Sequence, residues 1–169
     1  MDLIETLEAE HRVLLERLDE LERSLRRAAE GRGAAAAEAR ESLAAGWDSL
    51  LADLHVHFRK EEAALFPAAE SLPELREGAL EPLRAEHREH AVLEEEMTDA
   101  LAGLRAEGTA VAGGRLWRAA LSLTTLLREH IGKEDELLFP RLRRDLGPGA
   151  LAEAGRRARA GNPRLRKGP

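Results

Sequence analysis

Two segments of the chain, HFRKEEAALFP and HIGKEDELLFP, each place a histidine four residues before a glutamate. The pairs are His57 with Glu61 and His130 with Glu134. If both segments are helical, positions i and i+4 lie one turn apart on nearly the same face, so each pair presents an imidazole and a carboxylate in one direction. The chain has no cysteine, so any bound metal must be held by histidines and carboxylates of this kind.

Two further histidines, His11 and His87, stand in an AEHR segment that occurs twice. His11 fills a gap in a stripe of apolar residues that recur in steps of three and four, as on one face of a helix. The stripe consists of Ile4, Leu7, Leu14, Leu18, Leu21 and Leu25. His87 and His90 occupy a similar stripe with Leu80, Leu83, Met97, Leu101 and Leu104. These histidines are therefore predicted to face the protein interior.

The His/Glu pairs are also predicted to point inward, because leucines flank them at helical spacing. The flanking residues are Leu50, Leu54 and Leu65 for the first pair, and Leu116, Leu123, Leu126, Leu127, Leu137 and Leu138 for the second. A buried, unpaired carboxylate costs several kcal/mol, so two of them in one core require a compensating cation. A single zinc ion would use three or four of the six groups and leave the others unbound. Imidazoles together with carboxylates match the preference of a pair of iron ions.

The predicted metal ligands are His11, His57, Glu61, His87, His130 and Glu134. His90, three residues after His87, is either a fifth imidazole ligand or a residue that supports the ligands. His55 lies two residues before His57 and is predicted to face solvent. Glu62 and Asp135 directly follow Glu61 and Glu134, and they are interpreted as solvated acids or as hydrogen-bond partners of ligand histidines.

The elements that would position these residues are helices. The apolar residues are mainly Leu and Ala and only 3% of the chain is aromatic, which favours an all-α protein. The first helix is predicted to start at a capping box formed by Asp2 and Glu5 and to end at EGRG. The others are predicted over about 34–66, 82–107 and 114–138, with Pro67 and Pro140 as terminators. Each half would be a helical hairpin, and two hairpins predict an antiparallel up-down-up-down four-helix bundle with an internal two-fold repeat.

Charge divides the chain into a predicted domain over residues 1–140 and a basic C-terminal extension over 141–169. The first part carries 17 basic and 30 acidic residues and the second carries 9 and 2. An acidic bundle argues against nucleic-acid binding, and the extension, partly helical or flexible, would aid solubility or dock on the bundle. The N-terminal sequence has neither a signal peptide nor a membrane span, so no membrane partner and a cytoplasmic location are expected.

The ordered set of EHR, HFRKEEAALFP, EHREH and HIGKEDELLFP resembles the hemerythrin-like HHE cation-binding domains over about residues 1–140. The resemblance implies that His11 and His57 bind one iron, that His87 and His130 bind the other, and that Glu61 and Glu134 bridge them. Oxygen-carrying hemerythrins have a second histidine four residues after the first on the third helix, where this chain has Ala91. The chain is therefore similar to the HHE branch rather than to the respiratory carriers.

The resemblance implies a di-iron protein that binds or reacts with O2, NO or peroxide as a sensor, store or scavenger. One alternative is a di-iron oxidase or peroxidase with an unidentified substrate. Another is a helical bundle that binds manganese or zinc, since both accept histidine and carboxylate ligands.

Overall fold

A computed structural model describes residues 2–30, 33–107 and 109–160, and all of its regular elements are helical. The prediction of an all-α protein is therefore confirmed for the described part of the chain. The elements in order are α1 (Leu3–Glu30), α2 (Gly33–Lys60), η1 (Glu61–Leu65), α3 (Phe66–Ala69), α4 (Pro73–Gly78), α5 (Leu80–Glu107), α6 (Ala110–Lys133), η2 (Glu134–Leu138), α7 (Phe139–Asp145) and α8 (Pro148–Ala160).

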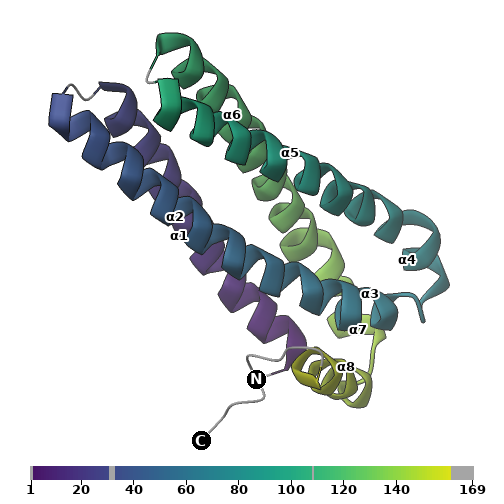
Figure 1. Cartoon of the computed structure of the whole chain (residues 1–169). Helices are drawn as coiled ribbons and strands as arrows, with labels where there is room; N and C mark the ends of the chain where they lie inside the picture. Colours follow the sequence, from purple (N-terminus) through teal and green to yellow (C-terminus); the bar gives the residue numbers. More distant parts are fainter. Residues whose placement is uncertain (1, 31–32, 108, 161–169) are drawn as a thin grey trace, which may run out of the picture.

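The long helices α1, α2, α5 and α6 form a helical bundle (Figure 1). Helix α1 packs along α2, and α5 packs along α6, so each half of the chain contributes one pair of neighbouring helices. Contacts of α1 with α6 and of α2 with α5 join the two pairs. No helix in the described ranges is long and apolar enough to cross a membrane.

The first helix begins at the capping box expected from the sequence. The backbone N–H of Glu5 donates to Oδ1 of Asp2 at 2.9 Å, and the backbone N–H of Asp2 donates to Oε2 of Glu5 at 2.8 Å. These bonds satisfy N–H groups that have no partner within the helix. The start of α1 is thereby fixed eight residues before His11.

The second and fourth long helices do not end at their prolines, contrary to the prediction. A π-helical turn, η1 or η2, precedes each proline, and the chain continues as α3 or α7. The backbone N–H of Phe66 donates to the carbonyl of Glu61, and that of Phe139 donates to the carbonyl of Glu134. Proline has no N–H, and its ring clashes with the carbonyl four residues earlier, so the wider turn lets the chain pass it. Both π turns begin at a predicted metal ligand.

Two clusters of buried apolar side chains fill the bundle, and the histidines lie between them. One cluster contains Leu14, Leu54 and Leu127, and the other contains Leu7, Ala64 and Leu138. On α1, His11 stands between Leu7 and Leu14. The predicted ligands therefore form a polar layer across an otherwise apolar interior.

One residue assigned to the apolar face of the fourth helix is exposed. Leu137 is 69% exposed, whereas its neighbour Leu138 is 2% exposed. Leu137 lies inside η2, and a π turn adds a residue to the helical repeat. The extra residue rotates the side chains that follow it about the helix axis. The buried face predicted for the fourth helix from the α-helical period is therefore wrong at Leu137.

Residues 148–160 of the basic extension form α8, which crosses the end of the bundle near α3, α7 and the start of α1 (Figure 1). Its buried stripe of Leu151, Ala154 and Ala158 belongs to the same apolar cluster as Leu3 and Leu65. Arg156 and Arg157, in contrast, pair with Glu153 of the same helix at the surface. The described part of the extension thus packs on the bundle through apolar contacts, and residues 161–169 lie outside the described ranges.

Candidate metal centre

The polar layer brings two pairs of imidazole nitrogens together. Nε2 of His11 on α1 lies 3.1 Å from Nε2 of His57 on α2. Nε2 of His87 on α5 lies 3.2 Å from Nε2 of His130 on α6. Three of these residues are 1% exposed, and the side chain of His87 is 9% exposed. Each half of the chain therefore supplies one buried pair of histidines.

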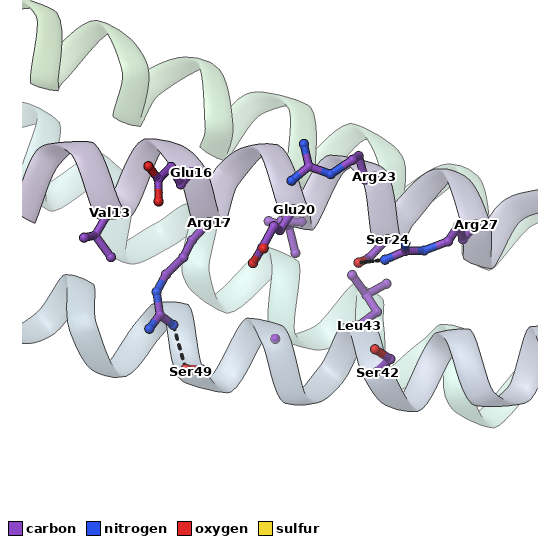
Figure 2. Close-up of a pocket in the computed structure, with 12 residues that line it drawn as sticks. Val13, Glu16, Arg17, Glu20, Arg23, Ser24, Arg27, Ser42, Leu43 and Ser49 are labelled. Atoms are coloured by element: carbon purple, nitrogen blue, oxygen red, sulfur yellow. Dashed lines mark hydrogen bonds between the residues drawn. The ribbon is translucent and has the colours of Figure 1, made fainter.

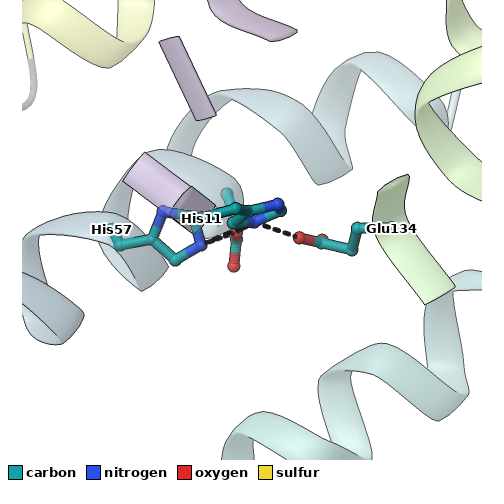
Figure 3. Close-up of side chains that lie close together, drawn as sticks. His11, His57 and Glu134 are labelled. Atoms are coloured by element: carbon teal, nitrogen blue, oxygen red, sulfur yellow. Dashed lines mark hydrogen bonds and ion pairs between the residues drawn. The ribbon is translucent and has the colours of Figure 1, made fainter. Parts of the chain in front are cut away.

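The carboxylates of Glu61 and Glu134, at the starts of the π turns, lie between the two pairs and are 0% exposed. Oε1 of Glu61 is 2.6 Å from Nε2 of His57, and its Oε2 is 3.0 Å from Nε2 of His87. Oε2 of Glu134 is 3.3 Å from Nε2 of His11 and 3.8 Å from Nε2 of His130 (Figure 3 shows the His11 side). Both carboxylates thus face histidines from both halves of the chain.

Each of the four histidines donates a hydrogen bond from its other ring nitrogen, Nδ1, to an acid outside this cluster. Nδ1 of His11 donates to Asp135 at 2.7 Å, that of His57 to Glu10 at 3.1 Å, that of His87 to Glu62 at 2.8 Å, and that of His130 to Glu86 at 3.0 Å. A carboxylate accepts hydrogen bonds, so these contacts keep a proton on Nδ1 and fix the orientation of the ring. In a neutral imidazole, Nε2 then presents its lone pair to the interior.

The convergence of these groups fits a cation. The four oxygens of Glu61 and Glu134 are buried, and none has a hydrogen-bond partner of acceptable geometry among the described residues. When the imidazoles are neutral, four Nε2 lone pairs and four carboxylate oxygens meet with no proton donor of their own. Buried acceptors without donors are costly, and a metal ion provides the electron-pair acceptor that both nitrogen and oxygen require.

Without a metal, protons take the place of the cation. Burial by itself would lower the pKa of His11, but its hydrogen bond to Asp135 and its contacts with Glu134 and Glu61 raise that pKa to about 11. Burial likewise opposes the shift at His57, where the charge of Glu61 and the contact with Glu10 raise the pKa to about 9. Burial, together with the negative charge of Glu61, raises the pKa of Glu134 to about 7. A metal must therefore displace protons from this layer when it binds.

The predicted ligands fall into two groups that share Glu61. His11, His57, Glu61 and Glu134 form one group whose ligand atoms lie within 4.8 Å of one another, and Glu61, His87 and His130 form the other. His55, predicted to face solvent, is 52% exposed and contacts Glu94 at 2.8 Å. The structure therefore brings together the six residues assigned from the sequence, and it places His55 outside them.

His90 is buried but belongs to neither group. It is 1% exposed, and its Nδ1 donates to Oε1 of Glu94 at 3.3 Å. The ring of Phe58 lies 5.2 Å from His90 and stacks on His87 at 4.1 Å, measured between ring centroids. The counterpart of His90 in the first half of the chain is Leu14, which also lies one turn past a predicted ligand histidine and is buried. His90 thus occupies an apolar position of the repeat, next to the ligand layer.

Replacing His90 with Leu should leave the number of bound metal ions per chain unchanged, because His90 is absent from both ligand groups and Leu already occupies the equivalent position 14. Elemental analysis of the purified variant measures this number. His87→Leu, on the same helix, serves as the matched variant that should lose metal. Loss of an ion from the His90→Leu protein would instead make His90 a fifth imidazole ligand.

Sequence reasoning missed Glu10, Glu86, Lys60 and Lys133. Glu10 and Glu86 directly precede His11 and His87, and Lys60 and Lys133 directly precede Glu61 and Glu134. The repetition of these residues in both halves was the available signal. Their roles depend on contacts between helices, which the spacing along one helix does not contain. Glu62 and Asp135 hold ligand histidines, which was the second of the two roles considered for them.

A separate groove between α1 and α2 lies away from the histidine layer and has a volume of about 630 Å³ (Figure 2). Arg17 donates to Ser49 at 2.6 Å and pairs with Asp53 at 2.8 Å, and Arg27 donates to Ser24 at 2.9 Å. Arg17 and Arg27 are therefore engaged by groups of the protein itself. Neither metal-ligand group includes a residue that lines this groove.

Comparison with known families places the chain in a cation-binding family. The sequence profile of the hemerythrin HHE cation binding domain matches residues 2–142. The chain belongs to the hemerythrin HHE family. This match confirms the resemblance seen in the sequence, and it includes every residue of the two ligand groups. Searches of curated proteins and of solved structures found no significant match.

Membership of the hemerythrin HHE family and the geometry of the polar layer support the same general activity. The family is defined by cation binding, and the described residues include a histidine and glutamate cluster that could hold a metal. The match ends at residue 142, so α8 lies beyond the family's domain even though it packs on it.

Proposed function

We propose that the protein is a non-haem di-iron protein that binds or reacts with O2, NO or peroxide as a sensor, store or scavenger. His11 and His57 hold one iron, His87 and His130 hold the other, and Glu61 and Glu134 bridge the two. The observation that carries the proposal is the convergence of four Nε2 atoms on four buried carboxylate oxygens that lack proton donors. Two ions use all six residues, whereas one ion would leave half of the layer without a partner.

The symmetry of the contacts supports a centre shared by two equivalent hairpins. We infer that residues 1–140 form an antiparallel four-helix bundle of two hairpin repeats and that residues 141–169 are an added basic extension. Asp135, from the second hairpin, holds His11 of the first, while Glu62, from the first, holds His87 of the second. These reciprocal contacts tie the hairpins together across the proposed metal pair.

The burial of the layer favours small ligands. Every proposed ligand side chain is at most 9% exposed, so a molecule that reaches the Nε2 cluster must be small or must open the bundle. A pair of iron ions supplies redox chemistry with such diatomic or peroxide ligands. The chain's own residues orient the imidazoles, neutralise the cations and exclude bulk water. This burial favours a sensor, store or scavenger over an oxidase that acts on a large organic substrate.

The alternatives are a di-iron oxidase or peroxidase and a bundle that binds manganese or zinc. Histidine and carboxylate ligands accept all three metals, so the residues alone do not select iron. Iron and manganese change oxidation state on exposure to O2, whereas zinc does not. The manganese and zinc alternatives therefore differ from the di-iron protein in metal content and in optical response, whereas a di-iron oxidase or peroxidase differs in turning over an organic substrate.

The test is elemental analysis of anaerobically purified protein combined with its optical spectrum before and after exposure to O2. We expect about two iron ions per chain and a new absorption band of a di-ferric centre after exposure. Zinc as the only metal, or iron with no spectral change, would overturn the di-iron proposal. One ion per chain, with His87 and His130 free, would overturn the two-ion assignment.

A further inference from the structure

A lysine, a glutamate and a ligand histidine form the same chain of contacts in both halves of the molecule. Nζ of Lys60 on α2 donates to Oε1 of Glu10 on α1, and Oε2 of Glu10 accepts from Nδ1 of His57 at 3.1 Å. In the second half, Nζ of Lys133 donates to Oε1 of Glu86, and Oε2 of Glu86 accepts from Nδ1 of His130 at 3.0 Å. Each glutamate therefore uses one oxygen for the lysine and the other for the histidine.

The two lysines differ in burial, although their contacts are equivalent. The side chain of Lys60 is 6% exposed, and that of Lys133 is 42% exposed. Lysine is almost never fully buried unless it is paired, so the position of Lys60 depends on its contact with Glu10. Charges interact more strongly where water is excluded. The lysine end of the contact is shielded from water in the first half and open to it in the second, so we expect Lys60 to act on its glutamate more strongly than Lys133 does, although Glu10 is 29% exposed and Glu86 is 12% exposed.

A carboxylate that accepts from Nδ1 increases the electron density on Nε2, and a cation on that carboxylate reduces the effect. The lysine therefore has two consequences for the histidine. It fixes the position of the acceptor, and it limits how strongly the imidazole donates to a metal. The acceptors of the other two histidines, Asp135 and Glu62, have no lysine contact within the described part of the chain, and their side chains are 39% and 46% exposed to solvent.

We propose that Lys60 is a positioning residue of the candidate metal centre, which acts through Glu10 to orient His57 and to weaken its donation to the metal. Lys133 acts in the same way through Glu86 on His130, with a smaller effect. The two metal positions, which have the same types of ligand, are thereby made unequal in donor strength. This inference rests on the di-iron function proposed above.

The test measures the midpoint potential of the iron-loaded protein. Lys60→Met removes the charge and keeps much of the side-chain length, so His57 donates more strongly and the potential should fall. Glu10→Gln removes the negative charge behind His57, so the potential should rise, and iron affinity should fall by about 10- to 100-fold, as for other outer-sphere partners of metal ligands. If the two substitutions merely loosened the fold, they would not be expected to shift the midpoint potential in opposite directions.

A double-substitution cycle separates action through Glu10 from the bare charge of the lysine. If Lys60 acts through Glu10, Lys60→Met should shift the potential less in the Glu10→Gln protein than in the wild type. Equal shifts in both backgrounds would overturn the proposal. Lys60→Arg should restore the wild-type potential, because it keeps the positive charge.

Lys133→Met provides the matched control from the other half of the chain. It replaces a half-exposed side chain, so it tests the proposal even if Lys60→Met does not fold. The expected result is a shift of the same sign that is smaller than that of Lys60→Met. If no lysine variant shifts the midpoint potential while iron stays bound, the proposed role of the lysines is overturned and the proposed di-iron function is not. A wild-type protein that binds no iron would overturn the proposed function itself.

Discussion

Removing the metal should lower the melting temperature of the protein by roughly ten degrees or more. The ligand atoms come from α1, α2, α5, α6 and the two π turns, so the metal binds the folded arrangement and hardly the unfolded chain. A ligand present at a thousand times its dissociation constant then stabilises the folded state by about 4 kcal/mol. In a domain of this size, each kcal/mol corresponds to a few degrees.

The measurement is a thermal melt followed by circular dichroism, with and without a chelator. The His57→Ala variant lacks a proposed ligand of the first metal position but keeps those of the second, so chelation should lower its melting temperature clearly less than that of the wild type. His55→Ala is the matched control from the same helix, because His55 is 52% exposed and contacts Glu94 rather than the cluster. Its response should equal that of the wild type. An unshifted wild-type melt, or a His55 variant that behaves like the His57 variant, would contradict the inward face assigned to α2.

The six clustered residues were predictable because helical periodicity determines which side of a helix a residue occupies. His11 lies among leucines on α1, and Glu61 follows His57 of α2 by one turn, so both were expected to face the core once the segments were helical. The repeat then indicated that His87, His130 and Glu134 would meet them. The face of a helix that a residue occupies and the repetition of a motif can both be recognised in the sequence without knowledge of tertiary contacts.

The π turns were not predictable in this way, although their prolines were visible. Pro67 and Pro140 usually indicate the end of a helix, and here the backbone instead widens for one turn and continues. Phe66 and Phe139, both 0% exposed, pack in the same apolar cluster as α8, so the segments after the π turns make tertiary contacts that the sequence pattern does not contain. The burial of α8 likewise depends on tertiary contacts, which its charge pattern did not reveal.

The acids that hold the histidines were only partly predictable. A surface acid next to a ligand is ordinarily solvated, and Asp135 and Glu62 are indeed partly exposed. Each nevertheless reaches a histidine of the opposite hairpin, and this contact requires knowledge of how the hairpins face one another. The clustering of the six candidate ligands thus follows from the faces of single helices, whereas the acids around them follow from how the helices pack.

Glu61→Ala should weaken metal binding by roughly tenfold more than Glu134→Ala, a difference of about 1.4 kcal/mol in binding free energy. The repeat alone predicts equal losses, because the two glutamates are equivalent in sequence. In the structure, however, Glu61 belongs to both ligand groups, and Glu134 belongs to one. Glu61 uses both oxygens, with Oε1 at 2.6 Å from His57 and Oε2 at 3.0 Å from His87. Glu134 faces His11 and His130 through Oε2 alone, at 3.3 and 3.8 Å, so the loss of Glu61 removes the closer contact from each metal position.

The protonation of Glu134 adds to this difference. Burial and the charge of Glu61 raise the pKa of Glu134 to about 7, whereas the charge of His57 and the contacts with the other histidines hold the pKa of Glu61 well below its usual value despite burial. A metal that binds Glu134 therefore competes with protons more than a metal that binds Glu61. This proton competition reduces the net contribution of Glu134 to affinity.

Competition with a chelator of known affinity measures the metal dissociation constants of the two variants, and circular dichroism verifies that both remain folded. Glu136→Ala is a suitable control, because Glu136 is an exposed acid in the same π turn as Glu134 and belongs to neither ligand group. It should bind metal as the wild type does. Equal losses for Glu61→Ala and Glu134→Ala would mean that the metal draws the two carboxylates into equivalent bridges, and a larger loss for Glu134→Ala would contradict the central position of Glu61 between the two pairs of histidines.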